Sequence, residues 1–268
     1  NGTITGTSTG TYSYGICNEG GTIGTLTNNG TTTGTSTSSS GYGIYNKSAT
    51  IGTLLNNGTI TGTTENRNGY GIYNQDASIT ELLNNGFIRG TGGSSFYQSG
   101  YGIYHDAMDI NIEKLTNNGI ITGTSENGDG YGIATFINTA VIKILVNNGT
   151  ITGTTENSDG YGIDTTNDAT LANTGVIYGK TNAIINVGTA NNYGLLISQT
   201  GDTVSGGTSI TNSYGLIFKD TGGSYTAEIS DYSRFGTIAK DEEVVVDYDE
   251  NSQAIKKTYT IINAKAEG

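Results

Sequence analysis

Residues 56–74 read NNGTITGTTENRNGYGIYN and contain the markers of a pattern that recurs along the chain. In this stretch Thr59, Thr61 and Thr63 alternate with Ile60 and Gly62. A two-residue period of this kind is typical of a β-strand with one buried face. The stretch therefore predicts short strands separated by corners rich in Asn and Gly.

Three markers repeat in the same order through successive copies. One is the triplet Asn-Asn-Gly, and another is an Ile followed three residues later by Leu. The third is Tyr-Gly-Ile, whose Tyr residues lie 28 to 31 positions apart. Its copies begin at Tyr14, Tyr42, Tyr70, Tyr101, Tyr131 and Tyr161. A regular period in this range is the signature of a repeat architecture.

No single copy could bury its apolar residues alone, so the copies must stack. Each strand would pair in parallel with its equivalent in the next copy, which makes each copy one rung about 4.8 Å high. We therefore predict an all-β fold, a right-handed parallel β-solenoid (β-helix) with rungs of about 28–30 residues. One interior column would contain Ile4, Ile60, Ile88, Ile121 and Ile151.

The composition agrees with β-structure and excludes several other classes. There are 43 Gly and no Pro, the hydrophobic fraction is 33%, and no 3.6-residue apolar period is sustained. The net charge of −12 disfavours nucleic acid as a partner. The lone Cys17 can form no internal disulfide. The chain begins at Asn1 instead of Met, which indicates an excised piece of a longer protein.

Two parts of the chain are expected, residues 1–224 as β-helix repeats and residues 225–268 as a C-terminal cap or hairpin extension. After Ile163 the rhythm shortens, which predicts smaller last rungs. Val244–Tyr248 and Ala254–Ile262 are alternating runs that predict a β-hairpin. This hairpin is interpreted either as a cap on the open solenoid end or as an interruption before further repeats.

The Asn-Asn-Gly-Thr-Ile-Thr-Gly-Thr rungs with Tyr-Gly-Ile-Tyr-Asn resemble the passenger domains of bacterial (type V) autotransporters over roughly residues 1–220. Such repeats also occur in other β-helical adhesins. The resemblance implies a β-helical surface adhesin of a Gram-negative bacterium, displayed outside the outer membrane or secreted, with roles in adhesion, autoaggregation or biofilm formation. The membrane barrel of that family is absent from this sequence.

Catalytic, cofactor and metal sites are not expected. His105 stands where other copies have Asn46 and Asn74, so it is interpreted as a variable corner residue instead of a member of a triad. Glu65, Glu126 and Glu156 occupy equivalent loop positions, and Asp129 and Asp159 occupy another equivalent pair. These carboxylates are interpreted as solvated turn residues, with Ca²⁺ binding as the alternative.

The binding residues that we predict are aromatic. Phe96 and Tyr97 interrupt the polar composition of the one long loop, Gly92–Ser99. A partial column of Tyr45, Tyr73 and Tyr104 lies three residues after the Tyr-Gly-Ile column. Because strict alternation would put residues three apart on opposite faces, we expect one column inside or at a corner and the other outside. The second column is then either a contact surface or a simple stack.

Together these observations predict a non-catalytic adhesive or self-associating stalk. Its partner would be a host-surface protein or glycan, or identical chains. The alternative is a carbohydrate-active β-helix enzyme, either a polysaccharide lyase or a glycoside hydrolase, which would carry convergent acidic and basic residues outside the repeat register.

Overall fold

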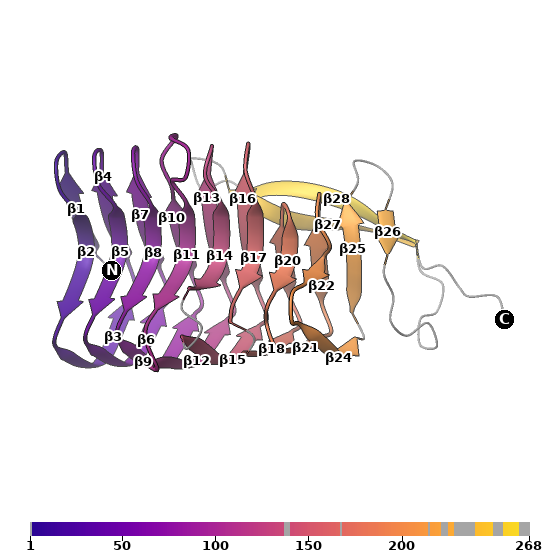
Figure 1. The fold of residues 1–268 in the computed structure, drawn as a ribbon, viewed down its shortest axis with the longest axis horizontal. Helices are drawn as coiled ribbons and strands as arrows, with labels where there is room; N and C mark the ends of the chain where they lie inside the picture. The colour runs from indigo at the N-terminus through magenta and orange to yellow at the C-terminus, as the bar shows by residue number, and fades with distance from the viewer. Residues whose placement is uncertain are drawn as a thin grey trace.

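The computed structural model describes residues 2–136, 140–166, 168–213, 215–220, 225–227, 239–248 and 254–262. These residues form an all-β, right-handed parallel β-solenoid, and no helix occurs among them (Figure 1). The predicted fold class is therefore confirmed. Three parallel sheets run along the solenoid, and each turn of the chain contributes one strand to each sheet.

Sheet A consists of β1 (Thr3–Ser8), β4 (Thr31–Ser36), β7 (Thr59–Thr64), β10 (Phe87–Thr91), β13 (Ile120–Ser125), β16 (Thr150–Thr155), β19 (Val176–Gly179), β22 (Leu195–Ser198), β25 (Leu216–Asp220) and the antiparallel β26 (Tyr225–Ala227). Sheet B consists of β2 (Ser13–Glu19), β5 (Gly41–Lys47), β8 (Gly69–Gln75), β11 (Gly100–Asp106), β14 (Gly130–Thr135), β17 (Gly160–Asp164), β20 (Asn182–Ile185) and β23 (Val204–Ser205). Sheet C consists of β3 (Thr22–Asn28), β6 (Thr50–Asn56), β9 (Ser78–Asn84), β12 (Asn111–Asn117), β15 (Val141–Asn147), β18 (Thr170–Asn173), β21 (Thr189–Asn192) and β24 (Ser209–Ser213). The strands shorten from β18 on, as the sequence rhythm predicts.

The predicted Ile column is confirmed by the register of sheet A. Ile60 pairs with Ile88, Ile88 with Ile121, and Ile121 with Ile151. Thr32 separates Ile60 from Ile4 in this column. Ile4 is half-exposed because no described rung lies beyond it, whereas Ile60 is completely buried. Ile residues from all three sheets meet in one continuous core, where close packing of apolar side chains stabilises the stack.

Asn residues form ladders at the corners, as expected from the Asn-Asn-Gly triplets. In the buried ladder the side-chain amide of Asn56 donates to Oδ1 of Asn84 at 2.7 Å, and that of Asn84 donates to Oδ1 of Asn117 at 2.8 Å. The same contact repeats at every rung from Asn28 to Asn192. Hydrogen bonding of this kind removes the cost of burying a polar side chain.

The predicted hairpin is also confirmed, with β27 (Ala239–Tyr248) pairing antiparallel with β28 (Ala254–Ile262). It is placed beside sheet A, where β27 contacts β16. Figure 1 shows the hairpin running along the C-terminal strands of the solenoid rather than closing its end. The role of this segment, a cap or an interruption before further repeats, stays a prediction.

Candidate functional site

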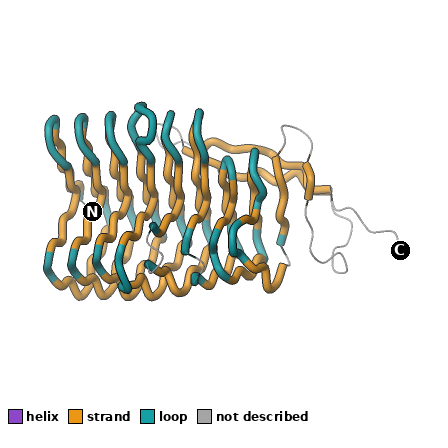
Figure 2. Tube along the Cα trace, in the orientation of Figure 1, coloured by secondary structure: helices purple, strands orange, loops and turns teal. Residues whose placement is uncertain are grey.

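The loop between β10 and β11 carries the predicted aromatic pair. The side chain of Phe96 is 74% exposed and that of Tyr97 is 92% exposed. Tyr97 also has a backbone φ of 66°, a left-handed conformation that residues other than Gly adopt rarely. Figure 2 shows the loops of the solenoid lined up along its edges, with this loop larger than its neighbours. The structure thus places both residues at the surface, as expected.

The two Tyr columns lie on the same face of sheet B, which corrects our expectation. Tyr42, Tyr45, Tyr70 and Tyr73 pack in one cluster, separate from the Ile core. The reason is the Gly of each Tyr-Gly-Ile marker. The pairing register of β5 with β8 omits Gly43, and Ile44, two residues after Tyr42, faces the core. Alternation is interrupted at the Gly, so side chains three residues apart can point the same way.

The rings of this cluster stack on one another along the solenoid. Centroids of Tyr42 and Tyr70 are 5.1 Å apart with an interplanar angle of 3°. The rings of Tyr70 and Tyr73, one from each column, are 4.8 Å apart. Stacking covers much of the ring surface: Tyr104 is buried, and Tyr45 and Tyr73 are half-buried. Tyr45, Tyr73 and Tyr104 thus form a stack in which neighbouring Tyr rings cover much of their surface, and their role in binding stays a prediction.

Burial also raises the pKa of these phenols. It raises the pKa of Tyr42 to about 12, mainly because a phenolate would lose its solvation. The Tyr73 hydroxyl donates to Oδ2 of Asp106 at 3.2 Å, and the carboxylate raises the Tyr73 pKa further. The Tyr131 hydroxyl makes the same contact with Asp129 at 3.1 Å. The cluster is thus neutral and hydrogen-bonded.

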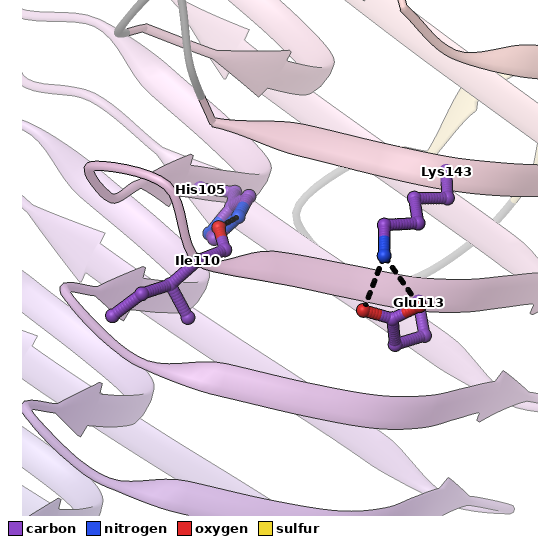
Figure 3. A network of polar contacts seen from close by, with 4 residues as sticks. All are labelled: His105, Ile110, Glu113 and Lys143. Carbon is purple, nitrogen blue, oxygen red and sulfur yellow. Dashed lines mark hydrogen bonds and ion pairs between the residues drawn. The ribbon is translucent and has the colours of Figure 1, made fainter.

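His105 continues a second buried Asn ladder, which confirms that it replaces Asn46 and Asn74 in the repeat. The Asn74 amide donates to Nδ1 of His105 at 3.0 Å, and Nε2 of His105 is 2.9 Å from the carbonyl oxygen of Ile110 (Figure 3). These partners assign the proton to Nε2. Burial lowers the pKa of the His105 imidazole. A neutral imidazole with both nitrogens engaged is suited to a structural role.

Three of the acidic loop residues line a groove beside sheet A. Glu65, Glu126 and Glu156 border a cavity of about 760 Å³ that also contains Arg89. The Arg89 Nε donates to the Thr91 hydroxyl at 3.1 Å. Asp129 accepts hydrogen bonds from the hydroxyls of Ser158 and Tyr131. In the described part of the chain, no three His, Cys, Asp or Glu side chains come close enough to hold a metal ion.

A second hollow lies where the loops between sheets A and B meet, and we call it the loop hollow. Tyr12, Arg67, Asn68, Tyr97 and Gln98 line it together with the Ser residues of the preceding loop, and its volume is about 480 Å³. Sequence reasoning found Tyr97 but missed Tyr12 and Arg67. No other copy has an aromatic residue at the position of Tyr12 or a basic residue at the position of Arg67, and that departure was the available signal.

In comparisons with known proteins, no family model, curated protein or solved structure matches the chain. Among the described residues, no helix is both long enough and apolar enough to span a membrane.

Proposed function

We propose that this chain is an adhesive or self-associating stalk of a bacterial surface or secreted protein. The observation that carries the proposal is the exposed pair Phe96 and Tyr97, which projects from the side of an otherwise regular solenoid. Every interior ladder is occupied by the chain's own rungs, so a partner has access mainly to the sides. Exposed aromatic side chains of this kind often supply most of the binding energy of an interface.

The residue pattern of the rest of the surface supports a stalk. Ion pairs join neighbouring rungs at the surface, such as Lys47 with Glu19 at 2.8 Å and Lys143 with Glu113 at 2.8 Å (Figure 3). Exposed pairs stabilise little individually, but they match opposite charges on neighbouring rungs. Such a surface suits a rigid spacer that presents one or a few contact points.

The partner we propose is a host-surface protein or glycan, or another copy of this chain. The resemblance of the repeats to autotransporter passenger domains supports a location outside the bacterial outer membrane. Tyr45 and Tyr73, which keep part of their surface, are proposed as secondary contacts, and the buried Tyr104 as their support.

A carbohydrate-active enzyme is the second candidate, and one observation favours it. Arg89 replaces the Thr of the neighbouring rungs and lines the groove beside sheet A together with Glu65, Glu126 and Glu156. Glycoside hydrolysis needs two carboxylates flanking the scissile bond. Release of reducing ends from a panel of polysaccharides, lost on Glu126→Gln, would favour this candidate over the stalk.

The stalk proposal is tested with the double substitution Phe96→Ser and Tyr97→Ser in the displayed protein. We expect cell–cell aggregation or binding to host cells to fall at least about tenfold, because hot-spot aromatics commonly contribute that much. Far-ultraviolet circular dichroism should be unchanged, since both side chains are outside the core. Phe136→Ser is the matched control, because Phe136 is 73% exposed elsewhere on the solenoid. Undiminished binding by the double variant would contradict the proposal.

A further inference from the structure

The long loop between β10 and β11 borders the loop hollow. Residues of this loop pair with the loop of the preceding rung: Gly93 N donates to the Arg67 carbonyl at 2.9 Å, and Ser94 N donates to the Glu65 carbonyl at 3.2 Å. Ser99 N donates to Oδ1 of Asn68 at 2.8 Å. These contacts fix the loop against its neighbour, so Tyr97 and Gln98 form one wall of the hollow.

Arg67 provides a cation that the rest of the described structure leaves unpaired. Lys47, Lys114 and Lys143 each form an ion pair with a Glu one rung away. The Arg67 guanidinium is exposed and has no ion-pair partner among the described residues. No Asp or Glu lines the hollow, although the chain carries a net charge of −12. A guanidinium in this position is free to bind a carboxylate through two parallel hydrogen bonds.

The other lining groups favour a ligand rich in hydroxyls. The hollow contains Ser hydroxyls and the side-chain amides of Asn68 and Gln98, which donate and accept hydrogen bonds. Tyr12 and Tyr97, with 56% and 92% exposed side chains, border it from two different rungs. Tyr offers an apolar ring for the C–H faces of a sugar and a hydroxyl for its polar edge. A purely apolar ligand would leave these polar groups without partners.

We infer that the loop hollow binds a saccharide that carries a carboxylate. Arg67 pairs with the carboxylate, the Ser and amide groups bind the sugar hydroxyls, and Tyr12 and Tyr97 pack against the ring. The inference rests on the proposed adhesive function and names the chemistry of its partner. Phe96, the other aromatic residue of the exposed pair, does not line the hollow.

The test uses the whole chain with glucuronic acid, its methyl ester and glucose as probes, followed by saturation-transfer NMR and calorimetry. We expect glucuronic acid to bind and Arg67→Gln to weaken it about tenfold, as for a lost hydrogen bond to a charged group. The ester and glucose should bind weakly to both forms. Tyr12→Ser should weaken all three sugars, whereas Lys114→Gln, which changes a cation on sheet C, should leave every affinity unchanged.

Three outcomes would overturn the inference: no binding of glucuronic acid, equal binding of the acid and its ester, or equal affinity of the wild type and Arg67→Gln. The proposed adhesive function is tested separately, because Phe96→Ser alone leaves the lining of the hollow intact. If adhesion is lost on Phe96→Ser while glucuronic acid never binds, the stalk proposal stands and the saccharide site fails.

Discussion

Adjacent Asn residues of the Asn-Asn-Gly triplet have opposite roles. Asn84 is completely buried and donates to Oδ1 of Asn117 at 2.8 Å and to the Ile120 carbonyl at 3.1 Å. Asn85 is exposed, and its amide donates to Oδ1 of Asn57 at 2.9 Å, toward the preceding rung. The inner ladder therefore satisfies buried backbone and side-chain groups, whereas water can replace the bonds of the outer ladder.

This difference predicts unequal costs for substituting the two residues. Asn84→Ala leaves buried partners without hydrogen bonds, so we expect the free energy of unfolding to fall by about 2–3 kcal/mol. Asn85→Ala should change it by no more than about 0.5 kcal/mol. Denaturant unfolding followed by circular dichroism measures both values. Equal losses for the two variants would mean that the inner ladder does not stabilise the fold as argued.

At the scale of the strand, the Gly of each Tyr-Gly-Ile marker determines how sheet B packs. A Cβ atom at Gly71 would lie 2.5 Å from the Gly102 carbonyl oxygen and 2.6 Å from Cγ2 of Ile88. Sheet A therefore approaches sheet B closely at this point, and only Gly leaves room for the Ile column. The same bend turns both Tyr columns outward, so one residue type explains the core packing and the stacked rings.

Gly71→Ala is accordingly expected to destabilise the solenoid by about 1–3 kcal/mol or more, the usual cost of overpacking against backbone. Near-ultraviolet circular dichroism should also change, because displacement of the strand disturbs the stacked Tyr rings. Gly24→Ala is the matched control in a strand, since a Cβ atom there would meet no atom within 4 Å. A Gly71→Ala variant that unfolds at the same denaturant concentration as Gly24→Ala would disprove the close approach.

At the scale of the whole molecule, the outward-facing residues of sheet A change from polar to apolar along the solenoid. Near the N-terminal end its outward residues are Thr, such as Thr59 and Thr61, and they are partly exposed. Farther along, Tyr178, Ile197 and Phe218 face outward, next to core residues on the same strands, and yet they are buried. The hairpin β27–β28 runs along this region and contacts β16. We expect it to cover this apolar side.

Ending the chain before Ala239 tests that arrangement. The shortened protein should keep its parallel β circular dichroism, because the ladders of the three sheets lie upstream. It should bind the dye 8-anilinonaphthalene-1-sulfonate several-fold more strongly and aggregate more readily, since a large exposed apolar patch is a liability. Unchanged dye binding would show that something other than the hairpin covers Tyr178, Ile197 and Phe218.

Much of the architecture follows from the sequence alone, because every copy of a repeat must adopt the same fold and stack on its neighbours. The period sets which residues stack, so the Ile60 column, the Asn84 corner and the place of His105 in an Asn ladder could all be predicted. The exposed pair Phe96 and Tyr97 was also visible, because it interrupts a polar loop. These features depend on contacts between equivalent positions in neighbouring rungs. The repeat period identifies those positions directly in the sequence.

Other features depend on contacts that no spacing reports, and only the tertiary structure decided them. The common face of Tyr42 and Tyr45 required the bend at Gly43, which breaks the alternation from which strand faces are predicted. The position of the hairpin depends on an approach between β27 and β16, which are far apart in the chain. The grouping of Tyr12, Arg67 and Tyr97 needed three loops to meet at one edge. In each case the arrangement is determined by packing between different segments. The distance between two such segments in the sequence does not predict their distance in space.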